Sequence, residues 1–186
     1  MRIVSGELKG RTLKGVKDLQ IRPTSERVRE AVFSAIGSRR NIENFRVLDL
    51  FAGSGALGIE ALSRGAGACT FVEKDQAVLK VLKNNIEALE ISSCCDLEHK
   101  DCAVFLKQRH AHYDLIFADP PYGAVLEQDL LELLRHSGIF KDGSLFIFEE
   151  ANTSSKKDKD YEFLKVLFRK AYGDTLVSMY EFWAKN

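Results

Sequence analysis

The tetrapeptide Asp119-Pro120-Pro121-Tyr122 contains the residue types in this chain that best suit chemistry. Two consecutive prolines restrict the backbone and remove two N–H donors, yet their carbonyl oxygens remain as acceptors. The Asp119 carboxylate and the fixed Pro120 carbonyl can therefore accept both hydrogens of one planar amino group, which frees a lone pair that a nucleobase otherwise delocalises into its ring. Tyr122 can stack on the same base. We interpret Asp119, Pro120 and Tyr122 as catalytic, although a rigid turn explains an isolated match of four residues equally well.

A second stretch, Ala52-Gly53-Ser54-Gly55-Ala56-Leu57-Gly58, follows an apolar run at residues 45–51. Glycines at this spacing, between a buried strand and a helix, allow a tight turn and a close approach of the backbone to a ligand. Glu73 falls twenty residues after Gly53, where dinucleotide-binding folds place an acid on ribose hydroxyls. The pattern predicts an adenosine-bearing cofactor and leaves a dinucleotide-binding fold open.

Apolar runs and helical spacings alternate along the chain, and they predict the elements that position these two stretches. We expect strands at residues 45–51, 69–73, 97–99, 113–118 and 144–149, with helices between them. The last two strands, at residues 163–171 and 175–183, form a hairpin at Gly173-Asp174. The fold class is therefore α/β: a doubly wound, mostly parallel seven-stranded sheet of Rossmann-like type with a C-terminal antiparallel hairpin.

The strand order decides whether the two stretches meet. If the order reverses between the first and the fourth strand, as in the usual wound sheet, the carboxyl ends of these strands open onto one crevice. The turn at Gly53 and the carboxylate of Asp119 then face the same ligand space, so that a cofactor and a flat amine meet there.

The amino-terminal part of the chain is basic. Residues 1–40 hold ten basic and four acidic residues, whereas the whole chain has a formal net charge of zero. We expect a small basic hairpin from residues 2–4 and 11–13, followed by a helix with Thr24 as N-cap that runs to Gly37 and carries Arg27 and Arg29 on its polar face. A basic end suits a polyanion, because phosphate contacts dominate nucleic-acid affinity, and a solvated charged face is the alternative.

The length and composition fit one soluble domain, residues 1–186, with a basic part at 1–40 and an α/β core at 41–186. The start has no apolar core of signal-peptide length, and no apolar stretch is long enough to span a bilayer, so we expect a cytoplasmic protein without a membrane partner. The four cysteines and four histidines lack the spacing of a metal site, so no metal is expected.

The order of these motifs resembles that of one family. The chain is similar to class I S-adenosylmethionine-dependent methyltransferases and resembles in particular the RsmD family of bacterial 16S rRNA guanine-N2 methyltransferases. The segments that carry the resemblance, over nearly the whole chain, are Arg2-Ile3-Val4-Ser5-Gly6 with Lys9-Gly10-Arg11, Arg22-Pro23-Thr24 with Arg27-Val28-Arg29-Glu30-Ala31, Asp49-Leu50-Phe51-Ala52-Gly53-Ser54-Gly55, Val72-Glu73-Lys74-Asp75 and Asp119-Pro120-Pro121-Tyr122. Because adenine-N6 methyltransferases share Asp-Pro-Pro-Tyr, the identity of the target base rests mostly on the amino-terminal segments.

The resemblance implies a role for each matching residue. Asp49 and the turn from Gly53 to Gly55 would hold the methionine part of S-adenosylmethionine, and Glu73 the ribose hydroxyls. Asp101 would lie near the adenine amino group, with an ordinary helix N-cap as the alternative. The full set of implied cofactor-binding residues is Arg22, Pro23, Thr24, Asp49, Phe51, Gly53, Gly55, Glu73, Lys74 and Asp101. The implied RNA-binding residues are Arg2, Lys9, Arg11 and Arg27.

The function implied by the resemblance is methyl transfer from S-adenosylmethionine to the N2 amine of a guanine in 16S rRNA, carried by a monomer and without a metal. The target base must be unstacked to be reached, so a loop or flexible nucleotide is the expected target. We expect such a substrate within a small-subunit assembly particle. Three alternatives stay open: an adenine-N6 methyltransferase acting on DNA or RNA, a nicotinamide dehydrogenase, and a non-catalytic RNA-binding or ribosome-assembly protein.

Overall fold

The computed structural model describes residues 1–15, 26–108, 111–121, 127–152 and 161–183. Its helices are α1 (Glu26–Gly37), α2 (Ala56–Ser63), α3 (Gln76–Ala88), α4 (Cys102–Leu106) and α5 (Glu127–Ser137), with a 3-10 turn at Ser92–Cys94. Its strands are β1 (Arg46–Leu50), β2 (Ala68–Glu73), β3 (Cys95–His99), β4 (Tyr113–Ala118), β5 (Phe140–Ala151), β6 (Leu164–Tyr172) and β7 (Thr175–Phe182). Within the described residues, no helix is long and apolar enough to cross a bilayer.

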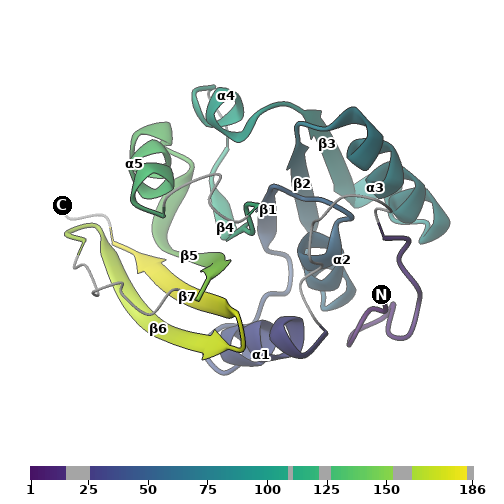
Figure 1. Ribbon diagram of the computed structural model, residues 1–186, viewed down its shortest axis with the longest axis horizontal. Coiled ribbons are helices and arrows are strands. Elements are labelled where there is room, and N and C mark those ends of the chain that lie inside the picture. Colours follow the sequence, from purple (N-terminus) through teal and green to yellow (C-terminus); the bar gives the residue numbers. More distant parts are fainter. Residues whose placement is uncertain (16–25, 109–110, 122–126, 153–160, 184–186) are drawn as a thin grey trace.

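All seven strands form one sheet, in the order β3-β2-β1-β4-β5-β7-β6 (Figure 1). Strands β1 to β5 pair in parallel, whereas β7 is antiparallel to both β5 and β6. The predicted fold class, with its reversal between the first and fourth strands and its C-terminal hairpin, is confirmed. Strand β5 is longer than the predicted span because it has partners on both sides, β4 and β7.

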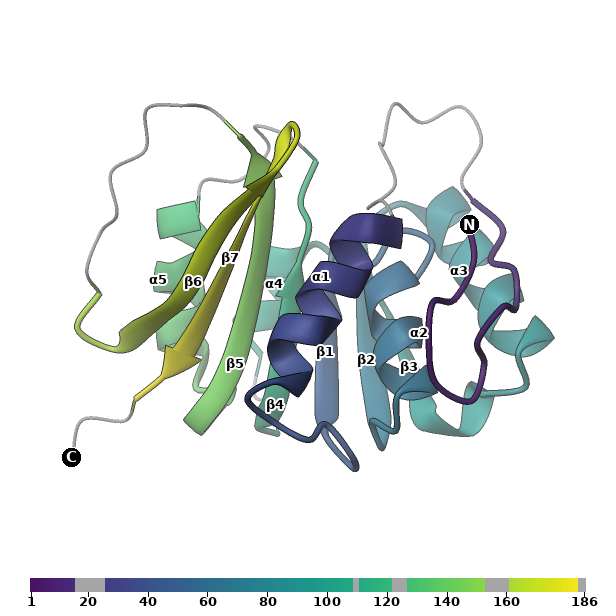
Figure 2. The same cartoon turned by 90° about the horizontal axis from the view of Figure 1, so that it is seen from below.

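Helices cover both faces of the sheet. Helices α1 and α2 lie on one face and α4 and α5 on the other (Figure 1), and the view from below shows α1 and α2 in front of the central strands (Figure 2). Alternate residues of a strand point to opposite faces, so Phe117 packs with the core of the α1 and α2 face, whereas Ile116 packs with that of the α4 and α5 face. The two cores hold the strand tips in fixed positions.

The amino-terminal residues pair with one another and also pack on α2. An antiparallel bridge joins Arg2 and Thr12, and the N–H groups of Ile3 and Leu13 donate to the carbonyl oxygens of Arg11 and Met1, at 3.0 and 2.8 Å. The two segments therefore pair as a hairpin requires, but neither forms a regular strand. The segment is also fastened to α2, because the backbone N–H groups of Val4 and Ser5 donate to Glu60, at 2.8 and 3.0 Å. The division at residue 40 stays a prediction.

Arg29 differs from the expectation for helix α1. Helical spacing predicts it on a polar face with Arg27, but its side chain is fully buried, whereas Arg27 is exposed. The Arg29 guanidinium donates to the carbonyl oxygen of Arg2 at 2.5 Å and lies 3.8 Å from a carboxylate oxygen of Glu60. Arg29 therefore ties α1 to the amino-terminal segment and to α2, and it is not a surface cation.

Candidate active site

The two predicted strand tips lie side by side at the carboxyl edge of the sheet. Strands β1 and β4 are neighbours, and their register ends with Leu50 beside Ala118. The next residues along the two strands are Phe51, which leads into the glycine turn, and Asp119. Asp119 also lies near Asp49 on β1: burial is the main cause of the raised pKa of Asp49, and the negative charge of Asp119 adds to it. The predicted juxtaposition is thus confirmed.

The glycine turn has a backbone that only glycine adopts without strain. Gly53 and Gly55 have φ angles of 57° and 85°. A Cβ atom at Gly55 would lie 2.4 Å from Cδ1 of Leu82, and one at Gly58 would lie 2.4 Å from Cε1 of Phe71. These glycines therefore let the turn and the start of α2 pack closely on the sheet and on α3, whereas a Cβ at Gly53 would find only the Phe51 carbonyl oxygen, at 3.9 Å.

Phe51 is the strained residue of this turn. Its φ is 64°, in the left-handed region that costs a non-glycine residue about 1–3 kcal/mol. Its side chain is half-buried and packs on the core of the α4 and α5 face. The strain occurs where the chain leaves β1 for the glycine turn, and residues held in such conformations cluster at functional sites.

Two carboxylates hold the turn in place. Glu73, at the end of β2, accepts hydrogen bonds from the backbone N–H of Gly53 at 3.0 Å and of Asp75 at 2.8 Å. Asp49 accepts one from Gly58, in the first turn of α2, at 2.9 Å. Burial raises the pKa of Asp49 well above its ordinary value, against the effect of this hydrogen bond, and the charges of Asp119 and Glu73 add to the rise. The crevice therefore gathers acidic side chains, and burial disfavours the charged form of Asp49.

On the β4 side, Asp119 is half-buried, Pro120 is buried and Pro121 is exposed. Backbone pairing with β1 and β5 stops at Ala118, so the prolines come where the sheet no longer needs their missing N–H groups. Tyr122, and the predicted cofactor residues Arg22, Pro23 and Thr24, lie outside the described residues.

Glu149 is a residue of the site that the sequence analysis missed. Strand β4 pairs with β5 as far as Ala118, which lies beside Phe148. The next residues, Asp119 and Glu149, are therefore neighbours. Asp119 thus lies between Phe51, after β1, and Glu149 on β5. Burial, followed by the charges of Asp119 and Asp49, raises the pKa of Glu149 well above its ordinary value. The signal was present in the sequence, because an acid at the end of an apolar strand resembles Asp49 and Asp119 in its setting.

The remaining predicted residues lie at the surface. Asp101 caps α4 by accepting a hydrogen bond from the N–H of Ala103 at 2.9 Å, so its N-cap role is confirmed, and its cofactor contact stays a prediction, as does that of the exposed Lys74. The predicted RNA-binding residues are all exposed: Arg2, Lys9, Arg11 and Arg27. Among the described parts of the chain, no group of three or more His, Cys, Asp or Glu side chains is placed to hold a metal ion.

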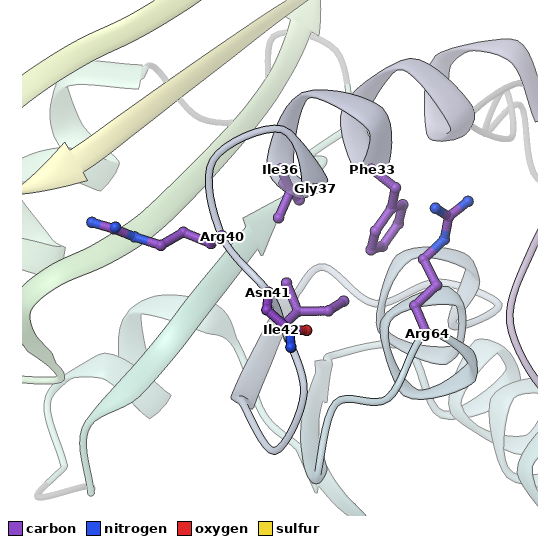
Figure 3. Close-up of a pocket in the computed structure, with 7 residues that line it drawn as sticks. All are labelled: Phe33, Ile36, Gly37, Arg40, Asn41, Ile42 and Arg64. Carbon is purple, nitrogen blue, oxygen red and sulfur yellow. The ribbon is translucent and has the colours of Figure 1, made fainter.

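A pocket of about 350 Å³ lies away from this crevice (Figure 3). It is formed where α1 and α2 end and where the chain enters β1, and is therefore at the amino edge of the sheet. Arg64 stacks over the ring of Phe33 in its wall, with 4.7 Å from guanidinium carbon to ring centroid, while Arg40 points away from it toward Glu181, 2.5 Å distant. None of the predicted site residues lines this pocket.

Three features define a class I methyltransferase fold. They are the strand order, the antiparallel β7 between β5 and β6, and a glycine turn after β1 that faces an acidic tip after β4. An all-parallel six-stranded dinucleotide-binding sheet lacks this last antiparallel strand. The sequence profile of the family described as "Conserved hypothetical protein 95" matches residues 1–181. The chain belongs to this family, which is the RsmD family.

Similar proteins are found in several bacteria. YlbH of Bacillus subtilis (strain 168) is 36% identical over 185 residues, which cover 97% of this chain and 98% of YlbH. The Escherichia coli (strain K12) protein named ribosomal RNA small subunit methyltransferase D is 36% identical over 149 residues, 80% of this chain and 74% of that protein. The solved structure of Escherichia coli yhhF superposes with a TM-score of 0.88 at 31% identity, covering 100% of this chain and 99% of the other.

Proposed function

We propose that this protein transfers a methyl group from S-adenosylmethionine to the N2 amine of a guanine in 16S rRNA. The observation that carries the proposal is the meeting of the glycine turn after β1 with Asp119 after β4, at one edge of adjacent parallel strands. Membership of the RsmD family, and relatives named ribosomal RNA small subunit methyltransferase D, supply the class of substrate.

The residues around the glycine turn fit S-adenosylmethionine. The turn is open at Gly53, where a Cβ would meet nothing closer than 3.9 Å, and it is lined by the carboxylates of Asp49 and Glu73. Each carboxylate oxygen has two lone pairs, so Glu73 can accept ribose hydroxyls in addition to its backbone donors, and Asp49 can face the cationic methionine part. Phe51, Gly55, Lys74 and Asp101 complete the proposed cofactor residues. When bound, the cofactor supplies an activated methyl group on a positively charged sulfur.

The chain itself has to orient the amine and stabilise charge. Asp119 and the carbonyl of Pro120 accept the two hydrogens of the guanine amine, which directs the nitrogen lone pair toward the glycine turn. As the nitrogen bonds to the methyl carbon, the bond from that carbon to sulfur would break and leave a neutral thioether. The nitrogen becomes positively charged, the negative carboxylate of Asp119 stabilises that charge, and the nitrogen then loses its surplus proton to solvent. Tyr122 stacks on the guanine ring. The exposed cations Arg2, Lys9, Arg11 and Arg27 bind RNA phosphates and position the unstacked base.

The test is to identify the methylated nucleoside. The protein is incubated with S-adenosylmethionine carrying a labelled methyl group and with one of three substrates: small-subunit assembly particles, protein-free 16S rRNA or double-stranded DNA. The labelled nucleosides are then identified by mass spectrometry. We expect label in N2-methylguanosine from the particles. Label in N6-methyladenosine, or label only in DNA, contradicts the proposal, and the Asp119→Ala variant serves as the control for contaminating activity.

A further inference from the structure

Glu149 is a buried acid for which the mechanism above has no role. Its side chain is 2% exposed, and its Oε1 atom accepts no hydrogen bond within the described part of the chain. A buried carboxyl oxygen without a partner lowers the stability of a protein. Stability therefore does not explain why an acid occupies this buried position.

The sheet places Glu149 between an acid and an apolar residue. On the β4 side its neighbour is Asp119, the residue after the last paired one, Ala118. On the β7 side it pairs with Val177, which is fully buried. Two more titratable groups act on it from other elements: Asp49 on β1, whose own pKa is raised by burial, and the guanidinium of Arg29 on α1. The carboxyl groups of Asp119 and Glu149 thus lie together where little water reaches.

Two neighbouring carboxyl groups of this kind do not both ionise readily, so one of them keeps a proton. Burial and the charges of Asp119 and Asp49 raise the pKa of Glu149, and the opposing effect of Arg29 is the smallest of these four. Arg29 also has another acid close by, since its Nε lies 3.8 Å from Glu60. Asp119 is less buried than Glu149 and is better solvated when ionised. The proton therefore belongs on Glu149.

We propose that Glu149 is a positioning residue: it holds the one proton of an Asp119–Glu149 carboxyl pair, keeps Asp119 ionised where the target amine docks, and offers its O–H to orient the Asp119 carboxylate. The role in methyl transfer rests on the function proposed above, whereas the shared proton does not. An ionised Asp119 accepts both amine hydrogens and stabilises the positive nitrogen, which a protonated Asp119 does less well.

The shared proton is tested by stability as a function of pH. The free energy of unfolding of the full chain is measured in denaturant from about pH 5 to pH 9, a range over which a raised carboxyl pKa is visible, for the wild type and for Glu149→Gln. A raised folded-state pKa gives stability that is present at low pH and is lost as the pH rises through that pKa. We expect the wild type to lose stability relative to Glu149→Gln as the pH rises. The same comparison in an Asp119→Asn background should give a smaller loss, because the coupled charge is gone.

The opposite slope overturns the inference. If Glu149 were ionised and paired with Arg29, its pKa would be lowered, and the stability of the wild type relative to Glu149→Gln would stay nearly constant over this pH range. The absence of a loss therefore also overturns the inference. An equal loss with Asp119 intact and in the Asp119→Asn background also overturns it, since Glu149 would then titrate independently of Asp119.

The positioning role is tested by single-turnover methyl transfer to assembly particles at saturating S-adenosylmethionine. Glu149→Gln mimics the protonated acid, so we expect a rate within about threefold of the wild type; Glu149→Leu lacks a donor and should be about tenfold slower or more, as for loss of one hydrogen bond to a charged group. Calorimetry should show unchanged cofactor affinity in both variants. A wild-type rate in Glu149→Leu overturns the positioning role. If the wild type transfers no methyl group, the proposed function fails, while the stability comparison still decides the shared proton.

Discussion

Two buried glutamates of this protein, Glu60 on α2 and Glu149 on β5, are 1% and 2% exposed, yet their surroundings differ. The Glu60 carboxylate accepts hydrogen bonds from the N–H groups of Val4 and Ser5 and from Nε of Arg64. In the described residues, Oε1 of Glu149 accepts none. The two acids are equally buried, so burial does not distinguish them. A buried acid whose oxygens are all hydrogen-bonded stabilises the fold, whereas one with an oxygen lacking a partner can take part in chemistry.

The largest effect is expected from a change in the crevice that leaves the Glu60 region intact. Asp119→Ala removes the acceptor that stabilises the positive nitrogen, so single-turnover methyl transfer should fall by about 10²–10³-fold, as for the loss of one preorganised group at a developing charge. Cofactor affinity, measured by calorimetry, should stay close to that of the wild type.

The matched control for Asp119 is Asp114, an acid near the other end of the same strand. Its carboxylate accepts a hydrogen bond from the N–H of Arg46 and pairs with Lys141 at the surface. Asp114→Ala should leave the transfer rate unchanged. A comparable loss of rate in both variants would mean that β4 matters for its packing and that its tip has no chemical role.

The second effect is the reverse, a change in the Glu60 region that leaves the crevice intact. Glu60→Gln deprives the buried Arg29 of its nearby charge, and breaking a buried charge pair costs about 3–5 kcal/mol of unfolding free energy. The measurement is urea unfolding at neutral pH, with Glu149→Gln as the matched substitution, for which we expect no loss. Equal losses at both positions would remove the distinction between the two glutamates.

A smaller effect, on cofactor affinity, is expected when glycine is replaced in the turn after β1, and none when it is replaced in a turn away from the site. Gly55→Ala adds a Cβ atom at a φ of 85°, only 2.4 Å from Cδ1 of Leu82, so the turn must shift. Because misplaced groups in a site bind poorly, we expect the affinity for S-adenosylmethionine to fall about 10-fold or more. Gly138→Ala is the control: φ there is 66°, but nothing lies within 4 Å. It should cost only about 1 kcal/mol of stability and no cofactor affinity, and an equal loss of affinity in both would contradict a specific role for Gly55.

The smallest effect is expected outside both regions, at the exposed Lys9. A phosphate contact contributes about one unit to the slope of log affinity against log salt concentration. Lys9→Ala should therefore reduce that slope for 16S rRNA by about one, whereas Lys170→Ala, an exposed lysine on β6, should leave it unchanged. Equal slopes for the wild type and Lys9→Ala would remove Lys9 from the RNA interface.

Most of the fold follows from the sequence because its signals are local. The apolar run at residues 113–118, for example, specifies strand β4 by itself. The prediction for the amino-terminal segment is incomplete. Residues 2 and 12 do pair, but the sequence does not show that the N–H groups of Val4 and Ser5 donate to Glu60, more than fifty residues away. The same long-range packing buries Arg29, which helical spacing alone places on a polar face.

The site was predictable where one strand tip supplies a whole motif, as at Gly53 and at Asp119. Glu149 was missed although it is an acid at the end of an apolar strand, because its place beside Asp119 depends on the register of β4 against β5. Asp101 shows the reverse case, since a helix N-cap accounts for that acid without any ligand.

The most direct test of the central claim is a crystal structure of the full chain with S-adenosylhomocysteine and a short RNA whose target guanine is unpaired. The account predicts the homocysteine part at the turn of Gly53 and Gly55, with the guanine amine between Asp119 and the sulfur. A guanine bound away from Asp119, or a cofactor product held elsewhere than at the glycine turn, would contradict it.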